Sequence, residues 1–94
     1  MDHHRPTATE KLAIEARLNA MLGAQTYDSL FLGFECGDIV DGIVHVYART
    51  EYFATRIDAF YGRQVAAAVE SVLKRPVMVV NVMPKDIADS PPLR

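Results

Sequence analysis

The sequence predicts one α+β domain whose elements follow the order helix, helix, strand, strand, helix, strand. Apolar residues recur every three or four positions in three stretches, which favours helices, and they alternate in shorter runs, which favours strands. The chain has 94 residues, is 50% hydrophobic and is 23% charged. This size and composition are typical of one soluble globular domain. We therefore expect a single core beneath a three-stranded sheet packed on helices.

The first helix is predicted over residues 7–22. Thr7 and Glu10 have the spacing of a capping box, and Gly23 stands where a helix ends. Placed at 100° per residue, the apolar side chains form two groups. One group suits the core, whereas the other is apolar surface, favouring either self-association through Leu12 and Ala16 or simply the helix preference of alanine. The groups are Ile14, Leu18, Met21 and Leu22, and Leu12, Ala13, Ala16 and Ala20.

A second, shorter helix is predicted over residues 24–33 and is followed by a hairpin. Four apolar side chains recur at helical spacing here, and we expect them in the core: Tyr27, Leu30, Phe31 and Phe34. Asp41 and Gly42 then separate two apolar runs, a strong hairpin signal because both turn positions need residues that accept positive φ. On the second strand, alternation directs Val44, Val46 and Ala48 to one face and Ile43, His45 and Tyr47 to the other.

The longest helix is predicted to begin after Thr50, its N-cap, and to end before Pro76. Its apolar face is expected to form the main wall of the core. The members of that face are Phe53, Ile57, Phe60, Tyr61, Val65, Ala68 and Val72. Residues 76–82 then predict the third strand, and the interaction domain is placed at 7–83. Residues 84–94 have the composition of a linker or disordered tail.

Charge and cysteine content restrict the possible functions. Ten basic and 12 acidic residues give a net charge of −2, which argues against a domain that holds nucleic acid through bulk positive charge. Cys36 is the one cysteine, as a reducing compartment permits, so we expect a cytoplasmic protein in which Cys36 is a small buried residue. The sequence contains no apolar run long enough to span a membrane.

Chemical motifs are missing from the sequence. His3 and His4 fall in an N-terminal stretch expected to lack regular structure, and His45 is isolated on a strand, so the spacing of a zinc site is absent. There is no phosphate-binding loop, dinucleotide fingerprint or nucleophile elbow. We therefore expect no catalytic residue, no metal and no cofactor.

The solvent side of the longest helix carries the strongest candidate site. Arg49, Arg56 and Arg63 are seven residues apart and lie nearly above one another, and Tyr52 joins them. Exposed tyrosine and arginine are enriched at interface hot spots, so this patch could bind an acidic protein surface or phosphates. The alternative is an ordinary solvated charged face.

The element order is similar to that of KH domains, which bind nucleic acid through a GXXG loop. That loop is absent here. His45, Tyr47 and Asn81 could nevertheless share the sheet face away from the helices and stack weakly on single-stranded nucleic acid. Ordinary cross-strand packing explains the same residues.

Several strings resemble the N-terminal domain of the bacterial replication initiator DnaA, over about residues 11–83. They are ARLNAMLGAQTYDSLF, the hairpin leading into VYARTEYF, and IDAFYGRQV. The resemblance implies a KH-like α+β module without enzymatic activity that self-associates, recruits the replicative helicase and receives initiator-regulating proteins. It also implies that residues 84–94 begin a linker to an ATPase domain, unless the chain is a free-standing relative that regulates the initiator.

The resemblance also assigns roles by position. The exposed aromatic residue that the family uses toward helicase and regulators falls on Tyr52. The first-helix tryptophan of self-association falls on Lys11, and an acidic helicase-contact residue of some members falls on Thr26. Arg49 and Arg56 replace a proline and a tryptophan of the family, which adds charge around Tyr52. These departures leave Leu12 and Ala16 as the apolar contact of the first helix.

Overall fold

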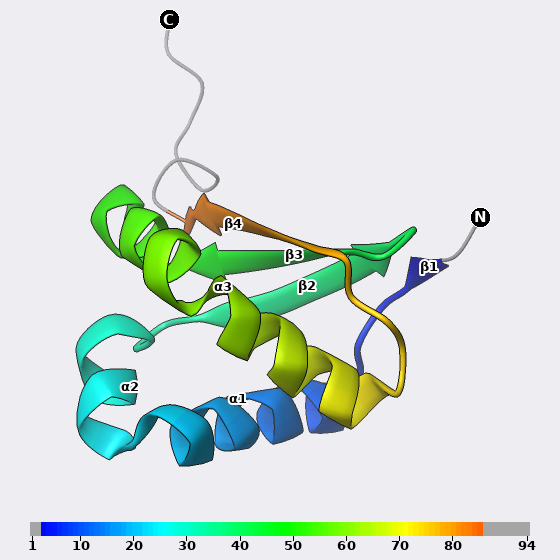
Figure 1. Ribbon diagram of the computed structural model, residues 1–94, viewed down its shortest axis with the longest axis horizontal. Helices are drawn as coiled ribbons and strands as arrows, with labels where there is room; N and C mark the ends of the chain where they lie inside the picture. The colour runs from blue at the N-terminus through cyan, green and yellow to red at the C-terminus, as the bar shows by residue number, and fades with distance from the viewer. Residues whose placement is uncertain (1–2, 86–94) are drawn as a thin grey trace, which may run out of the picture.

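The computed structural model describes residues 3–85 and confirms the α+β class (Figure 1). Helices and strands follow the expected order, with one additional strand at the N-terminus. The elements are β1 (His3–His4), α1 (Ala8–Leu22), α2 (Ala24–Leu30), β2 (Glu35–Val40), β3 (Ile43–Ala48), α3 (Glu51–Leu73) and β4 (Val79–Pro84). Residues 86–94 of the predicted linker lie outside the described part of the chain.

The sheet is mixed and four-stranded in the order β1-β2-β3-β4, so the expectation of three strands is wrong. β1 pairs antiparallel with β2, with His3 opposite Val40 and His4 opposite Ile39. A two-residue strand of histidines has no apolar alternation, which is why the sequence pattern did not reveal it. His3 and His4 are therefore part of the fold, contrary to expectation.

The hairpin at Asp41 and Gly42 is confirmed, with φ of 52° and 83°. Its two strands shift register between Cys36 and Ile39, where Gly37 and Asp38 together stand opposite His45. Such a bulge needs a close backbone approach. A Cβ atom at Gly37 would lie 2.9 Å from the His45 carbonyl oxygen and 2.9 Å from the Tyr47 ring, so a glycine is required there.

β4 completes the sheet by pairing parallel with β3, from Ile43 opposite Val79 to Ala48 opposite Pro84. It begins and ends two or three residues later than the predicted 76–82. The preceding residues carry the chain from the end of α3 back to the sheet, and the Met78 and Val79 N–H groups both donate to the Gly42 carbonyl. Pro84 has no N–H group to donate and ends the ladder.

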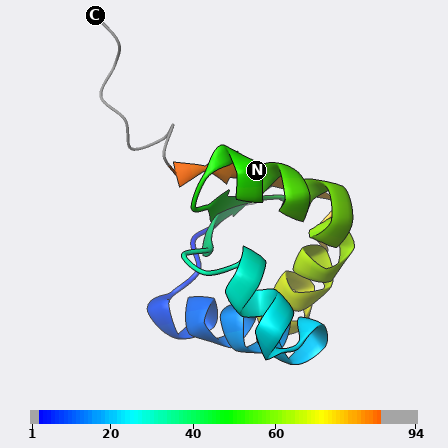
Figure 2. The same ribbon diagram turned by 90° about the vertical axis from the view of Figure 1, so that its left-hand side faces the viewer.

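The helices cover one face of the sheet, and the core lies between them. Figures 1 and 2 show α3 between β4 and the pair formed by α1 and α2. The predicted alternation of β3 is confirmed, because its residues at 44, 46 and 48 are buried beneath the helices. The fully or almost fully buried side chains are Ile14, Leu18, Phe31, Phe34, Cys36, Ile39, Val44, Val46, Ala48, Ala54, Ile57, Val65, Ala68, Val69 and Leu73.

The aromatic residues around α2 belong to the core, as predicted. Phe31 is the centre of the group: its ring stacks on Tyr27 at 5.6 Å between centroids and meets Phe34 at 5.2 Å. The Tyr61 ring approaches Phe31 edge-on at 5.8 Å. α2 has no side-chain N-cap bond, and its packing against α1 and the ring contact with α3 hold this short helix in place.

Both predicted N-caps are confirmed. The Thr7 hydroxyl accepts the Glu10 N–H, and the Glu10 carboxylate accepts the Thr7 N–H, forming the full capping box of α1. The Thr50 hydroxyl accepts the Phe53 N–H at 3.4 Å at the start of α3. α3 ends at Lys74, which is left-handed, two residues before Pro76.

Two residues assigned to the core are exposed. Met21 lies at the solvent side of α1, whose buried residues are Ile14 and Leu18. Phe60 on α3 is 65% exposed. The buried face of α3 includes Ala54, Val69 and Leu73, which the predicted face omitted. The packed face is therefore rotated about the helix axis relative to the predicted one, and Phe60 lies in solvent.

Candidate interaction surface

The exposed start of α3 carries an aromatic–guanidinium cluster made of Arg49, Tyr52, Phe53, Arg56 and Phe60. Thr50 caps the helix, so the side chains of residues 52, 56 and 60 follow at intervals of four and lie one above another. The Arg56 guanidinium carbon is 5.3 Å from the Tyr52 ring centroid and 5.8 Å from that of Phe60. One arginine thus stands between two exposed rings.

Arg49 joins this cluster from the other end. Its guanidinium carbon lies 4.7 Å from the Phe53 centroid, and the Phe53 ring meets Tyr52 edge-on at 5.3 Å. The aliphatic part of Arg49 lies beside Gly33. A Cβ atom added at Gly33 would be 3.5 Å from the Cβ atom of Arg49. Arg49 therefore lies beside the loop before β2, and Tyr52 is 61% exposed and free to meet a partner.

Arg63 is the predicted patch residue that does not join the cluster. It is exposed, but within residues 3–85 its guanidinium group stacks on none of the rings. It lines a hollow between α3 and β4 instead. Of the four predicted patch residues, Arg49, Tyr52 and Arg56 therefore belong to the cluster. Phe60, which was not predicted, occupies the position beside Arg56. The sequence held the signal, since Phe60 follows Arg56 by four residues and Tyr52 by eight.

The cluster has the chemistry of a protein contact. Rings supply large contact area at low entropic cost, and a guanidinium group beside rings can still donate N–H groups to a carboxylate or phosphate. The helix beneath is capped and packed along its length, so the side chains are presented on a rigid support.

Leu12 and Ala16 occupy the solvent side of α1, as predicted from the helical wheel. Leu12 is 66% exposed, and Ala13, Ala16 and Ala20 are exposed beside it. The use of this face in self-association stays a prediction.

His45 and Tyr47 lie on the outer face of the sheet, and the structure brings them together with Asn81. His45 is opposite Asn81 in the ladder, and the Asn81 amide nitrogen lies 3.2 Å from His45 Nδ1. Both His45 and Tyr47 are half-buried, and Tyr47 packs over Gly37. Much of each ring is therefore used within the sheet.

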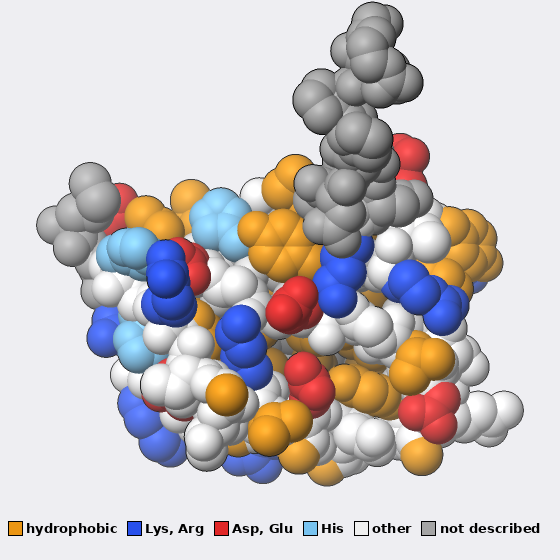
Figure 3. All heavy atoms as spheres, turned by 180° about the vertical axis from the view of Figure 1, so that it is seen from behind, with side chains coloured by type: hydrophobic (Ala, Val, Ile, Leu, Met, Phe, Trp, Pro, Cys, Tyr) orange, Lys and Arg blue, Asp and Glu red, His pale blue; other side chains and the backbone are white. Residues whose placement is uncertain are grey.

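A hollow of about 510 Å³ lies beside these rings and is of mixed charge. Its lining includes Lys11 together with Glu35 and Asp38. Figure 3 shows acidic, basic and histidine side chains intermingled on the face seen from behind, without one continuous basic surface. Such a surface offers weak electrostatic attraction for a nucleic-acid backbone.

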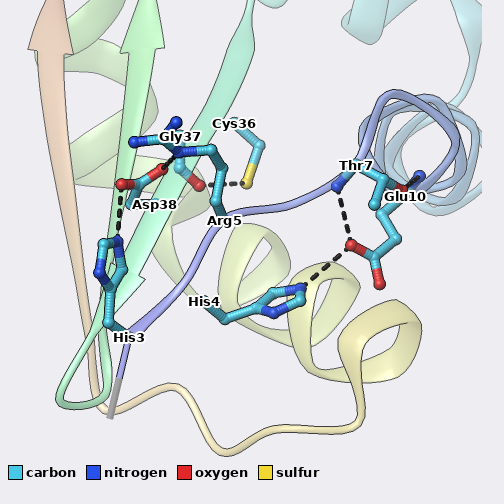
Figure 4. Close-up of polar contacts among 8 residues, drawn as sticks. All are labelled: His3, His4, Arg5, Thr7, Glu10, Cys36, Gly37 and Asp38. Atoms are coloured by element: carbon cyan, nitrogen blue, oxygen red, sulfur yellow. Dashed lines mark hydrogen bonds and ion pairs between the residues drawn. The ribbon is translucent and has the colours of Figure 1, made fainter. Parts of the chain in front are cut away.

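The N-terminal segment is held by histidine–carboxylate contacts that sequence reasoning missed (Figure 4). His3 Nε2 lies 2.8 Å from Asp38, with Arg5 3.6 Å from the same carboxylate. The hydrogen bond from His3 and the charge of Arg5 lower the pKa of Asp38. His4 Nε2 lies 3.1 Å from Glu10, whose pKa is lowered first by the Thr7 N–H and then by His4.

Cys36 is buried, as expected, and burial raises the pKa of its thiol to about 11. A thiol in that state is a poor nucleophile at neutral pH. Within residues 3–85, no group of three or more His, Cys, Asp and Glu side chains is arranged to hold a metal ion. Among the helices described, none is long and apolar enough to cross a membrane.

Comparison of the chain with protein-family models, with curated proteins and with solved structures found no match.

Proposed function

We propose that this chain is a non-catalytic protein–protein interaction module that acts in DNA replication initiation. The exposed stack of Tyr52, Arg56 and Phe60 on a rigid helix carries the interaction part of this proposal. The replication context is drawn from the resemblance to the DnaA N-terminal domain. The expected partners are the replicative helicase or an initiator-regulating protein.

A pull-down with purified helicase and regulators tests the proposal. Tyr52→Ala should abolish partner capture while the circular dichroism spectrum stays unchanged, because Tyr52 is exposed and helical. Met21→Ala, which truncates an exposed hydrophobic side chain on α1, is the matched control. Capture by Tyr52→Ala at the level of the unmodified chain would contradict the proposal.

Arg56→Lys separates charge from geometry at the same surface. Lysine keeps the positive charge but loses the planar fork that lies between the two rings. We expect binding to fall at least tenfold for Arg56→Lys and a similar loss for Phe60→Ala. Binding that survives in both variants would assign the contact to Tyr52 alone or to Arg63.

A second candidate function is weak binding of single-stranded nucleic acid by His45 and Tyr47. The observation that favours it is the outer sheet face that His45 and Tyr47 share with Asn81. Phosphate binding weakens steeply with salt, so a fluorescence titration at low salt is the sensitive test. An absence of binding at low salt would remove this candidate.

Two versions of the replication role differ in what the module binds. A piece of a complete initiator should capture helicase, whereas a free-standing regulator should bind the initiator itself. Sedimentation of the chain alone and mixed with an initiator distinguishes them. In the first version, Leu12→Lys should also weaken self-association through α1, because Leu12 is the exposed centre of that face.

A further inference from the structure

The sheet has one long bare edge. β4 is the outermost strand on one side and β1 on the other, and β1 has two residues. An edge strand presents unpaired N–H and C=O groups, and proteins usually protect such edges with charges, bulges or short strands. β1 is protected by its shortness. β4, in the described part of the chain, is not covered by another strand.

The β4 edge also lacks the charged side chains that prevent pairing. Residues 77–83 read VMVVNVM, without a charge. Met78 is 82% exposed and Val79 is 52% exposed. An uncharged, β-branched strand of this kind is a template for a further strand.

The neighbouring side of α3 consists of small residues. Thr55, Ala59, Gly62 and Ala66 lie on one side of the helix at 100° per residue. Thr55 lines a hollow with Val82 and Pro84, and the other three line one of about 500 Å³ with Met78 and Val80. α3 therefore runs antiparallel to β4 along the edge (Figure 1), and a Cβ atom at Gly62 would meet nothing within 4 Å.

We propose that two copies of this chain pair through their β4 edges, antiparallel about a two-fold axis that passes Val80. Pro76 and Pro84 stand four residues before and after Val80 and bound the same uncharged stretch in both copies. The product is one continuous sheet with α3 of each copy side by side.

The helix side has the same symmetry centre as the strand. The small residues pair about a point between Ala59 and Gly62, so that residue 55 faces 66 and residue 59 faces 62 of the other copy. By the hollows they line, positions near 60 on α3 lie beside Val80. One axis therefore serves both elements, which favours a second copy over an unrelated peptide.

β1, at the other edge of the sheet, is too short to accept a strand from another copy. The β4 contact therefore closes as a dimer and does not extend into a longer assembly. The dimer goes beyond the proposed replication role and does not depend on it.

Cross-linking tests the register directly. Antiparallel pairing about Val80 places position 80 opposite itself, with Cβ atoms about 4.5–5.5 Å apart. Val80→Cys should form a covalent dimer on mild oxidation, whereas Met21→Cys on α1 should not. The native Cys36 is buried and should not react. Equal cross-linking of both variants, or none at position 80, would overturn the proposal.

Sedimentation velocity tests the affinity. Met78→Lys places a charge at the edge on a side chain that is already exposed, so the fold is retained and the dimer dissociation constant should rise at least tenfold. Met21→Lys is the control, because it places a charge on an exposed side chain of α1, away from β4. A chain that stays monomeric at millimolar concentration, or a dimer weakened by Met21→Lys and not by Met78→Lys, would overturn the β4 pairing.

Discussion

The inner and outer sides of α3 both carry apolar or aromatic residues, yet the inner side packs in the core and the outer side faces solvent. The inner side buries Ala54, Ile57, Val65, Ala68, Val69 and Leu73 against the sheet and α1. The outer side places Tyr52 and Phe60 in solvent with Arg56 between them. Hydrophobicity alone does not distinguish the two sides, whereas the presence of packed neighbours does.

This difference separates stability from recognition within one helix. Substitutions on the inner side should lower the free energy of unfolding and affect binding only through the folded population. Substitutions on the outer side should change binding and leave unfolding almost unaltered.

The largest effect is expected for Ile57→Ala on the inner side. Ile57 is fully buried, and truncating such a side chain leaves a cavity that costs about 2–5 kcal/mol. Urea unfolding followed by circular dichroism measures the loss. Thr55→Ala, which is exposed two residues earlier, is the matched control and should change stability by less than about 0.5 kcal/mol. A loss below about 1 kcal/mol for Ile57→Ala would break the assignment of the inner side.

A smaller effect is expected at the start of the helix that supports both sides. Thr50→Ala removes the hydroxyl that accepts the Phe53 N–H and should cost about 1 kcal/mol. Thr50→Asp retains an acceptor and should restore most of the loss. If Thr50→Asp is as unstable as Thr50→Ala in the same urea titration, the cap does not contribute as proposed.

The sequence predicted the features that local chemistry determines. Thr7, Thr50, Asp41 and Gly42 carry short-range signals for caps and a turn, and all four act as expected. The alternation on β3 was also sufficient, because one buried face suffices to orient a strand. These features need no knowledge of distant residues.

The errors arose where distant residues decide. β1 exists because His3 and Arg5 reach Asp38, more than thirty positions away, and a two-residue strand has no periodicity. A helical wheel centred on the large side chains of α3 places Phe60 on the packed side of the helix. The packed face also includes the small residue Ala54, which turns that face away from Phe60. The same rotation concealed the stacking of Phe60 on Arg56, which is part of the candidate site.

A gain in stability is expected at Gly62, which lies between the two sides of α3. Its added Cβ would meet nothing within 4 Å, and alanine is favoured over glycine inside a helix by about 1 kcal/mol. Gly62→Ala should therefore raise the urea midpoint of the monomer. Destabilisation would show that the helix needs glycine there for a contact within the chain.

The smallest effect on stability is expected for Arg56→Gln on the outer side. Cation–π contacts at exposed positions contribute about 0.5–1 kcal/mol at most, and glutamine is a comparably good helix former. The unfolding free energy should therefore fall by about 1 kcal/mol at most, while partner capture falls at least tenfold. Arg17→Gln, an exposed arginine on α1 that donates to Ser71, is the control and should retain capture. If Arg56→Gln instead unfolds as readily as Ile57→Ala, the outer side contributes to the fold and the separation of the two roles along α3 is wrong.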